Sequence, residues 1–467
     1  MPKVSVIIPC LNSVKYIRET MESVVNQTLR DIEILVVDAG STDGTLDVLH
    51  EYADSDERVR IIHSDRKSTG YQCNVGMDAS SGEYIGFVET DDYIALTMYE
   101  ELYAIIMEEK VDYVKSDFEM FADTSVGRVF VRYRPLCPEN RGLYNKIISI
   151  VDCPELILRD VNIWNGLYAK NFIERKRIKQ NETPGAAFQD IGFVLQTLIH
   201  AEKVIYIDRS HYRYRRDNTG SSVYNKNTCD FITWELEYVM RCLADASFEP
   251  FRLCCPMIYA RLFEMFSYNL GIIYLGSGET SRKIQNRILR FKGIFQEAYD
   301  SMDDAARIWV NPVSYIKIKL LLDDSSQFYQ RLRQQTEYDQ KLLCDFIRYL
   351  NQQSTILIFG AGEIGGAVFC YLLRCGIDVV GFCDNNTSRW GESYMGRMIF
   401  SPTDAARQYP EGAFVISLAD DYILGIKSQL MKFGIKPEKI CRYVNLIAPH
   451  TAFEIDAMTD VQGVEHG

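Results

Sequence analysis

Two adjacent carboxylates, Asp91 and Asp92, follow a short apolar segment, residues 83–88, that is rich in β-forming side chains. Such a segment is typical of a buried parallel strand, and open α/β sheets bind ligands at the carboxyl ends of their strands. Two carboxylates this close repel each other unless a cation lies between them. A hard divalent ion that also binds a diphosphate would meet this requirement. The alternative is a solvated turn that caps the next helix, since Asp is a favourable N-cap residue.

The segments that precede these carboxylates alternate between strand and helix patterns. Residues 4–9, 33–38 and 59–63 are short apolar segments, and apolar residues with helical spacing lie between them. This alternation predicts a doubly wound α/β sheet. The turn after the second strand, residues 38–45, contains glycines that permit a tight turn and hydroxyl groups that can cap a helix.

Length and composition limit the class of protein. A chain of 467 residues is too long for one core and predicts two or three domains. Its 47% hydrophobic and 25% charged residues are ordinary for a globular protein, and the net charge of −13 argues against non-specific nucleic-acid binding. Thirteen cysteines without a C-x-x-C pair favour a reducing compartment over a zinc site. With no signal-peptide pattern and no long uncharged apolar segment, the sequence predicts a cytoplasmic protein.

The rest of the chain divides into three regions. Residues 226–350 have helical periodicity and are predicted to form a helical linker region. Residues 351–447 contain a strand, a G-x-G-x-x-G pattern that begins at Gly360, a helix, and a strand that ends in Asp384. This succession predicts a small Rossmann-like α/β domain with a docking or regulatory role, and nucleotide binding is the alternative. Residues 448–467 are predicted to be a loose tail.

Residues 281–295 combine an apolar stripe with basic flanks. Ile284, Ile288, Phe291 and Phe295 fall on one face of the expected helix, and five basic residues surround them. One interpretation is peripheral contact with the inner face of the cell membrane. The other is a helix that packs on its own domain and exposes a solvated basic face.

Three segments, VSVIIPCLN, EILVVDAGSTDGT and GEYIGFVETDDY, resemble in order and spacing the successive signatures of family 2 glycosyltransferases. The resemblance implies a GT-A fold, a doubly wound mixed sheet, over residues 1–225, and a nucleotide-sugar donor that is expected to be UDP-linked. It implies that Asp91 contacts the donor and that Asp91 and Asp92 bind Mg²⁺ or Mn²⁺. The residues that it places against the base and ribose are Pro9, Leu11, Asn12 and Asp38.

A fourth segment, GAAFQDIGF at residues 185–193, resembles the segment in which this family carries its catalytic base. Asp190 is the matching residue, and Gln189 replaces the commoner glutamate. An inverting transfer needs one carboxylate to accept the proton of the acceptor hydroxyl as it attacks the anomeric carbon. By pattern alone, Asp190 also fits the start of a helix.

Residues 211–223, HYRYRRDNTGSSV, resemble the family segment that folds over the donor diphosphate. Alternation places Arg213 and Arg215 on one face of an extended chain, where their guanidinium groups would suit phosphate oxygens. Trp164 occupies the position at which the family places an aromatic side chain near the acceptor, although a core tryptophan fits as well. Ala39 replaces a common aspartate, which leaves the specificity for the base open.

The resemblance therefore implies an inverting, metal-dependent transfer of a sugar to a glycan or lipid-linked acceptor in polysaccharide synthesis. Two other functions fit parts of the sequence: a regulatory protein that senses a nucleotide sugar, and a bifunctional enzyme with a nucleotide-dependent C-terminal activity. Asp190 distinguishes the transferase from the sensor, because a sensor needs no base. The sequence names neither the sugar, the acceptor nor the oligomeric state.

Overall fold

The computed structural model describes residues 2–124, 127–218, 220, 227–243, 249–276, 281–300, 310–418 and 420–443. The chain divides into two compact units. The first comprises Met1–Glu119 and Arg134–Leu332, and the second comprises Met120–Tyr133 and Arg333–Gly467. The predicted tail, residues 448–467, lies outside the described residues.

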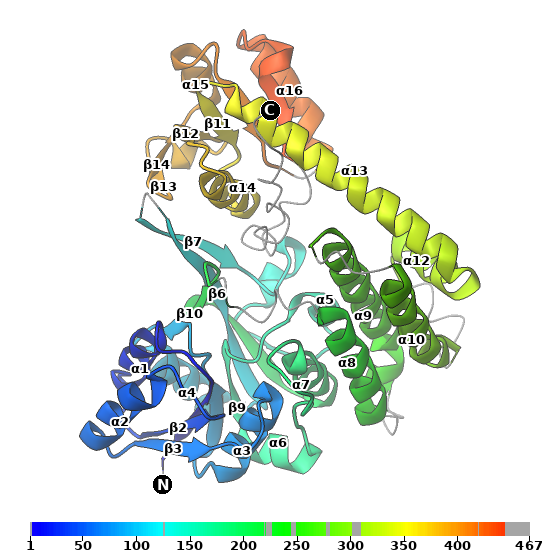
Figure 1. Ribbon diagram of the computed structural model, residues 1–467. Helices are drawn as coiled ribbons and strands as arrows, with labels where there is room; N and C mark the ends of the chain where they lie inside the picture. Colours follow the sequence, from blue (N-terminus) through cyan, green and yellow to red (C-terminus); the bar gives the residue numbers. More distant parts are fainter. Residues whose placement is uncertain are drawn as a thin grey trace. The chain divides into compact units, whose positions relative to one another are not determined.

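The larger sheet has the strand order β3-β2-β1-β4-β9-β6-β10-β5, with β7 paired to β6 and β8 paired to β10 (Figure 1). Strands β1 to β4 are parallel where they pair, and β9 is antiparallel to both β4 and β6. The predicted mixed α/β sheet is therefore confirmed. Its strands are β1 (Val4–Cys10), β2 (Ile32–Asp38), β3 (Val59–His63), β4 (Tyr84–Phe87), β5 (Tyr93–Ile94), β6 (Tyr113–Thr124), β7 (Gly127–Tyr133), β8 (Ile147–Ile148), β9 (Gly166–Ala169) and β10 (Val204–Arg215).

Helices alternate with the first strands and leave them little contact with solvent. Every residue of β2 is buried, and so are six of the seven residues of β1, which explains why both read as continuous apolar runs. The helices of this part are α1 (Ile17–Val25), α2 (Thr45–Ser55), α3 (Thr69–Ala79), α4 (Met98–Glu109), α5 (Leu156–Arg159), α6 (Lys170–Lys176) and α7 (Gln189–His200), with a 3-10 helix η1 (Pro138–Leu143).

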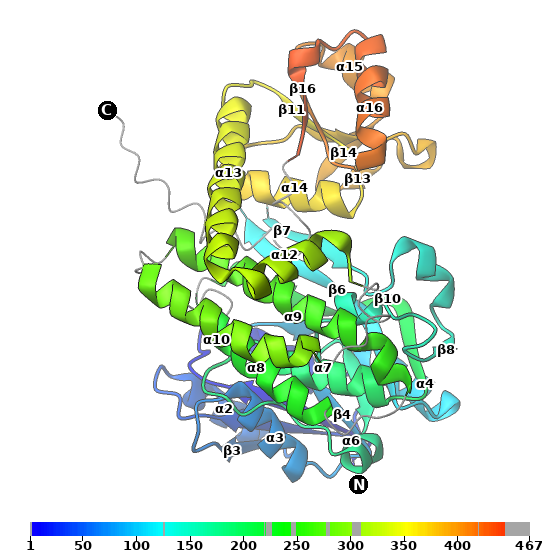
Figure 2. The ribbon, with the colours of Figure 1, turned by 90° about the vertical axis from the view of Figure 1, so that its right-hand side faces the viewer.

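The region predicted as a helical linker is helical, and most of it packs within the first unit. Helix α8 contacts α7, α9 and α10, and α9 contacts α5 (Figure 2). The helices among the described residues of this region are α8 (Thr228–Leu243), α9 (Glu249–Gly276), α10 (Ser281–Asp300), α12 (Pro312–Asp323) and α13 (Ser325–Asn351). We call α8, α9 and α10 the helical layer.

The apolar stripe of residues 281–295 lies inside the helical layer. All four of its members are buried: Ile284, Ile288, Phe291 and Phe295. The Phe291 ring stacks on Phe266 of α9 with 3.9 Å between centroids, and Arg287 pairs with Asp230 of α8 at 3.1 Å. The predicted membrane contact through this helix is therefore wrong, because its apolar face is the face that packs on α8 and α9. Among the described residues, no helix has the length and apolar character that a membrane span requires.

The second unit contains a smaller sheet with the order β13-β14-β12-β11-β15-β16. Its strands other than β13 run parallel, and the parallel order corresponds to 3-2-1-4-5, as in doubly wound sheets. The second, smaller α/β domain is thus confirmed. Its elements are β11 (Ile356–Phe359), α14 (Glu363–Arg374), β12 (Gly381–Cys383), η3 (Thr387–Arg389), β13 (Ser393–Tyr394), β14 (Arg397–Phe400), α15 (Pro402–Gln408), β15 (Ala413–Ile416), α16 (Asp420–Lys432), η4 (Pro437–Lys439) and β16 (Ile440–Arg442).

The glycine-rich turn between β11 and α14 is held by side chains of its own domain. The Asp384 carboxylate accepts a hydrogen bond from the backbone N–H of Ala361 at 2.8 Å. Arg389 donates to the carbonyl of Ala361, and the Tyr394 hydroxyl donates to the carbonyl of Gly362 at 3.1 Å. These contacts give the turn a structural role, and nucleotide binding by this domain stays a prediction.

The burial of the α10 stripe predicts a clear difference between two neighbouring substitutions. Phe291→Ala should lower the free energy of unfolding by about 3–5 kcal/mol, because a buried aromatic side chain leaves a cavity. Leu289→Ala on the same helix should change it by less than about 0.5 kcal/mol, because Leu289 is 55% exposed. Urea denaturation of the full chain measures both values. Equal effects of the two substitutions would contradict the packing of α10.

Candidate functional site

The loops after β1 and β2 are tied to each other at the carboxyl edge of the sheet. The backbone N–H of Asn12 donates to the Ser41 hydroxyl at 2.8 Å, and the Asn12 side-chain carbonyl accepts from the N–H of Thr42 at 2.8 Å. Asn12 adopts a φ of 53°, which asparagine tolerates better than most residues. The Asp38 carboxylate accepts N–H groups of its own turn, including that of Ser41 at 2.9 Å. The two loops thus form one rigid edge.

The residues predicted to contact the donor base and ribose all belong to this edge. Pro9 lies in β1, opposite Val37 of β2. Leu11 and Asn12 follow it, and Asp38 ends β2. The structure therefore brings these residues together, and their contact with a donor stays a prediction.

Three carboxylates gather where β4 ends. Glu89, Asp91 and Asp92 each offer an oxygen atom, and these atoms lie within 4.8 Å of one another. Asp92 is 1% exposed. Its Oδ1 accepts the backbone N–H of Arg215 at 2.7 Å, whereas its Oδ2 is buried without a hydrogen-bond partner. A buried carboxylate oxygen without a partner needs an explanation, and a bound cation supplies one.

Burial raises the pKa of all three groups, and repulsion by neighbouring carboxylates adds to it at Glu89 and Asp92. Burial raises the pKa of Asp92 well above its ordinary value, and the neighbouring Asp91 and Glu89 carboxyls raise it further. Burial, followed by Asp91 and Asp190, raises the pKa of Glu89 to about 8. Three oxygen ligands suit a hard cation such as Mg²⁺ or Mn²⁺, and its charge would remove the repulsion. The residues present therefore fit the predicted divalent ion.

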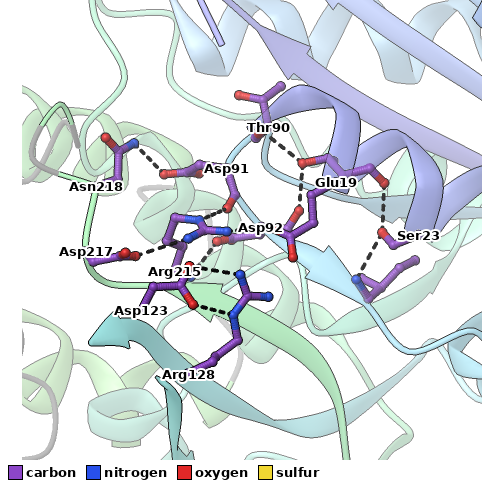
Figure 3. Close-up of polar contacts among 12 residues, drawn as sticks. Glu19, Ser23, Thr90, Asp91, Asp92, Asp123, Arg128, Arg215, Asp217 and Asn218 are labelled. Carbon is purple, nitrogen blue, oxygen red and sulfur yellow. Dashed lines mark hydrogen bonds and ion pairs between the residues drawn. The ribbon is translucent and has the colours of Figure 1, made fainter. Parts of the chain in front are cut away.

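The end of β10 holds this acidic cluster in place. The Arg215 guanidinium donates to the carbonyl of Asp91 at 2.9 Å and pairs with Glu19 of α1 and with Asp217 (Figure 3). Asn218 donates to Asp91 Oδ2 at 2.8 Å. The Arg215 side chain is only 3% exposed, and its guanidinium is occupied by protein groups. This burial does not suit the predicted contact with phosphate. Its contacts order the cluster instead.

The other predicted side chains of this region have mixed outcomes. Arg213 pairs with Glu119 of β6 at 3.0 Å, and its contact with phosphate stays a prediction. Trp164 is 2% exposed, and its ring stacks on Tyr212 with 4.0 Å between centroids. The structure contradicts the predicted acceptor contact of Trp164, because this side chain is part of the core beneath β10. The Tyr212 hydroxyl in turn accepts the N–H of Glu89 at 3.0 Å, so the aromatic pair supports the acidic cluster.

Asp190 is the second residue of α7 and is partly exposed. Desolvation raises the pKa of its carboxyl to about 6, while the cations Arg261 and Lys115 oppose the rise. Phe188, which precedes the helix, has a φ of 70°. A bulky residue in this left-handed region stores strain of about 1–3 kcal/mol, a feature that clusters at functional sites.

The hydrogen bonds of Gln189 explain why this chain has an amide at a position where the family more often has a glutamate. Its side-chain N–H groups donate to the carbonyls of Thr183 and Gly185, each at 3.0 Å, which a carboxylate could not do. Gly185 is also joined to the loop after β3, because its N–H donates to the carbonyl of Lys67 at 2.9 Å. These bonds fix the segment that leads into Asp190 against the donor side of the sheet.

Several residues of the site were missed from the sequence. Glu89 lies two positions before Asp91, and the spacing could have identified it as a third carboxylate of the cluster. Glu19 and Asn218 come from α1 and from the segment after β10. No local pattern marks these two residues, because only the folded sheet brings them to the cluster.

Family comparisons agree with the two-domain arrangement. Residues 5–160 match the model of glycosyl transferase family 2, and residues 352–441 match the model described as C2185-like, N-terminal. The first match includes Asp38, Asp91 and Asp92, whereas Asp190 lies beyond it.

Individual relatives cover part of the chain. The glycosyltransferase GlyA of Streptococcus pneumoniae is 28% identical over 264 residues, which are 55% of this chain and 35% of GlyA. The uncharacterized glycosyltransferase EpsJ of Bacillus subtilis is 30% identical over 223 residues, which are 46% of this chain and 62% of EpsJ. This chain thus spans between a third and two thirds of the length of these two relatives.

The fold of the first unit has solved counterparts. The structure of S. aureus TarS residues 1–349 with UDP-GlcNAc superposes with a TM-score of 0.58 and 18% identity, covering 72% of this chain and 92% of that one. At this identity the likeness concerns the fold alone. The family match, which includes the acidic cluster, shows a glycosyl transferase family 2 domain at residues 5–160.

Proposed function

We propose that this chain transfers a sugar from a nucleoside-diphosphate sugar, UDP-linked, to a hydroxyl group of a glycan or lipid-linked acceptor, with inversion and with Mg²⁺ or Mn²⁺. The observation that carries the proposal is that an acidic cluster and a separate carboxyl with a raised pKa lie in the same region of the domain. An acidic cluster suited to a cation and a diphosphate lies within electrostatic reach of a separate carboxyl, Asp190, whose pKa is raised to about 6. The TarS structure with UDP-GlcNAc supports the choice of donor class.

In this proposal the acidic cluster and the base have different tasks. Asp91 and Asp92, with Glu89, would hold the divalent ion, which neutralises charge on the departing diphosphate. The rigid edge formed by the β1 and β2 loops would hold the nucleoside. Arg215 holds the Asp92 carboxylate through its backbone N–H and the Asp91 backbone carbonyl through its side chain, so that the cluster would not have to reorganise during the reaction.

The chemical step needs one proton acceptor. Asp190 takes the proton of the acceptor hydroxyl while the oxygen of that hydroxyl forms a bond to the anomeric carbon. The bond from that carbon to the diphosphate oxygen breaks, and the electron pair leaves with the nucleoside diphosphate. Attack from the face opposite the leaving group inverts the anomeric configuration.

Substitution of the base tests the proposal directly. Asp190→Asn should leave donor binding within about threefold of wild type and lower turnover by about 10²–10⁴-fold, the usual contribution of a positioned base. Release of the nucleoside diphosphate from a panel of nucleotide sugars measures turnover, and calorimetry measures binding. Glu202→Gln, an exposed residue just beyond α7, is the control. Turnover of Asp190→Asn within tenfold of wild type would contradict the base assignment and favour a nucleotide-sugar sensor.

The raised pKa of Asp190 predicts the acid limb of the pH profile. The base works only when ionised, so kcat/KM should fall about tenfold per pH unit below a pH of about 6. An aspartate with an ordinary pKa would place this limb near pH 4. Measurement of kcat/KM between pH 4.5 and 8 at saturating metal decides, and a limb near 4 would contradict the desolvated geometry of Asp190.

The acidic cluster predicts an unusual response to Asp92→Asn. Because the folded-state pKa values of Glu89, Asp91 and Asp92 are raised, the metal-free protein should lose stability as the pH rises from the unfolded values near 4 through the raised ones. Removal of one charge should therefore raise the Tm of the metal-free protein at pH 8, and raise it less at pH 5.

The same variant should lose its response to metal. UDP with Mn²⁺ should raise the Tm of wild type at pH 8 and fail to raise that of Asp92→Asn, because one ligand is gone. Glu109→Gln, an exposed change at the end of α4, should respond like wild type. An Asp92→Asn protein that gains as much Tm as wild type from UDP and Mn²⁺ would refute the metal role.

A further inference from the structure

Glu235 is a buried carboxyl of the helical layer that the proposed mechanism does not use. It lies in α8 and is 1% exposed. One of its oxygens, Oε1, accepts the backbone N–H of Gly192 at 2.7 Å, and the other, Oε2, accepts a side-chain N–H of Asn181 at 2.9 Å. A carboxyl group is rarely buried without a role, because its desolvation is unfavourable. Its two partners indicate what the role is.

The first partner belongs to the helix that carries the proposed base. Helix α7 has no side-chain cap from its own N-cap residue, Phe188, although the first N–H groups of a helix need acceptors from outside. Glu235 supplies such an acceptor from α8. The approach is close enough to require glycine, since a Cβ atom at Gly192 would lie 2.4 Å from Glu235 Oε1.

The second partner connects Glu235 to the donor side of the site. Asn181 packs tightly on α3, because a Cβ atom at Gly70 would lie 1.9 Å from the carbonyl oxygen of Asn181. Helix α3 follows the loop after β3, to which the segment before Asp190 is hydrogen-bonded. Glu235 thus joins α7 and the donor side to α8.

We propose that Glu235 is a positioning residue for Asp190 and fixes the first turn of α7 from the helical layer. Gln189 holds the start of the same turn through the carbonyls of Thr183 and Gly185. Asp190 lies between these two anchors, and a displacement of about 1 Å at such a group can lower a rate by about 10²-fold. The inference rests on the proposed function, because it concerns the same base.

The ionisation of Glu235 suggests which replacement keeps its role. Burial, with a smaller contribution from the Asp190 charge, raises the pKa of this carboxyl to about 8, although the hydrogen bonds from Asn181 and Gly192 oppose the rise. Glu235 is therefore mostly uncharged near pH 7, and glutamine has nearly the same shape. The carbonyl oxygen of a glutamine can still accept the Gly192 N–H, and a turned Asn181 amide can accept from the new NH₂ group.

Kinetics of the full chain test the proposal. Glu235→Ala should lower kcat by about 10–100-fold with the KM for the UDP-sugar within about threefold of wild type, whereas Glu235→Gln should keep kcat within about threefold. The matched control is Glu237→Ala, because Glu237 lies on the same helix with its side chain 40% exposed and pairs with Arg290 at 3.5 Å. It should resemble wild type in both kcat and Tm.

A second variant breaks the same contact from the other side. Gly192→Ala should reproduce the loss of kcat, because its Cβ would lie 2.4 Å from Glu235 Oε1 and 2.8 Å from Cδ1 of Tyr238, so that both side chains must move. The part of the loss that comes from the Glu235 contact should not add to that of Glu235→Ala. If Glu235→Ala does not fold, the kcat values of Gly192→Ala and Glu235→Gln test the proposal: the first should be lowered and the second should stay near that of wild type. Lower Tm values with a wild-type kcat in Glu235→Ala and Gly192→Ala would overturn the proposal, since Glu235 would then be structural only.

Amide hydrogen exchange gives a readout that needs no activity. Glu235→Ala should remove the protection of the Gly192 N–H, and Glu237→Ala should leave it intact. Unchanged protection of Gly192 in Glu235→Ala would overturn the proposal even if the chain transferred no sugar. Absence of turnover by wild type with every nucleotide sugar would count against the proposed function and not against the anchoring of α7.

Discussion

The repulsion among Glu89, Asp91 and Asp92 is the constraint on which the rest of the site depends. Their oxygens lie within 4.8 Å of one another, and desolvation raises the pKa of each group. The protein meets only part of this demand, since Asp92 has one hydrogen-bonded oxygen and one without a partner. In the proposed function a divalent ion, bound together with the donor diphosphate, would meet the rest of this demand.

The surrounding elements can be understood as supports for this cluster. Strand β10 returns antiparallel to β5, next to β4's carboxyl end, and delivers the Arg215 backbone N–H to Asp92. The rings of Trp164 and Tyr212 stack on each other, and the Tyr212 hydroxyl accepts the Glu89 N–H. This packing supports the loop that carries the acidic cluster. These contacts are needed because the repulsion among like charges would otherwise push the three carboxylates apart.

Local sequence patterns predicted the strands, the glycine turns and the pair of carboxylates, Asp91 and Asp92, after β4, whereas the family resemblance singled out Asp190. These features depend on period, turn chemistry and charge at the end of a strand, all of which are short-range. Trp164 and Arg215 were misjudged for a different reason. A side chain's type indicates what it can contact, but whether it contacts ligand or protein depends on what covers it, and Tyr212 and Glu19 cover these two from distant parts of the chain.

The helix at residues 281–295 is a second case in which distant residues decide what a side chain contacts. An apolar stripe with basic flanks has the same period whether it lies on a membrane or on another helix. Here the neighbours decide, since Phe266 of α9 covers Phe291 and Asp230 of α8 neutralises Arg287.

The helical layer therefore has a task that a linker would not have. It covers α7, supplies the Glu235 carboxyl to its first turn, and places Arg261 near enough to oppose the rise in the pKa of Asp190. The family match ends at residue 160, before any of these residues. The residues that the proposed function assigns to the base and its support thus lie beyond the matched segment, on α7, α8 and α9.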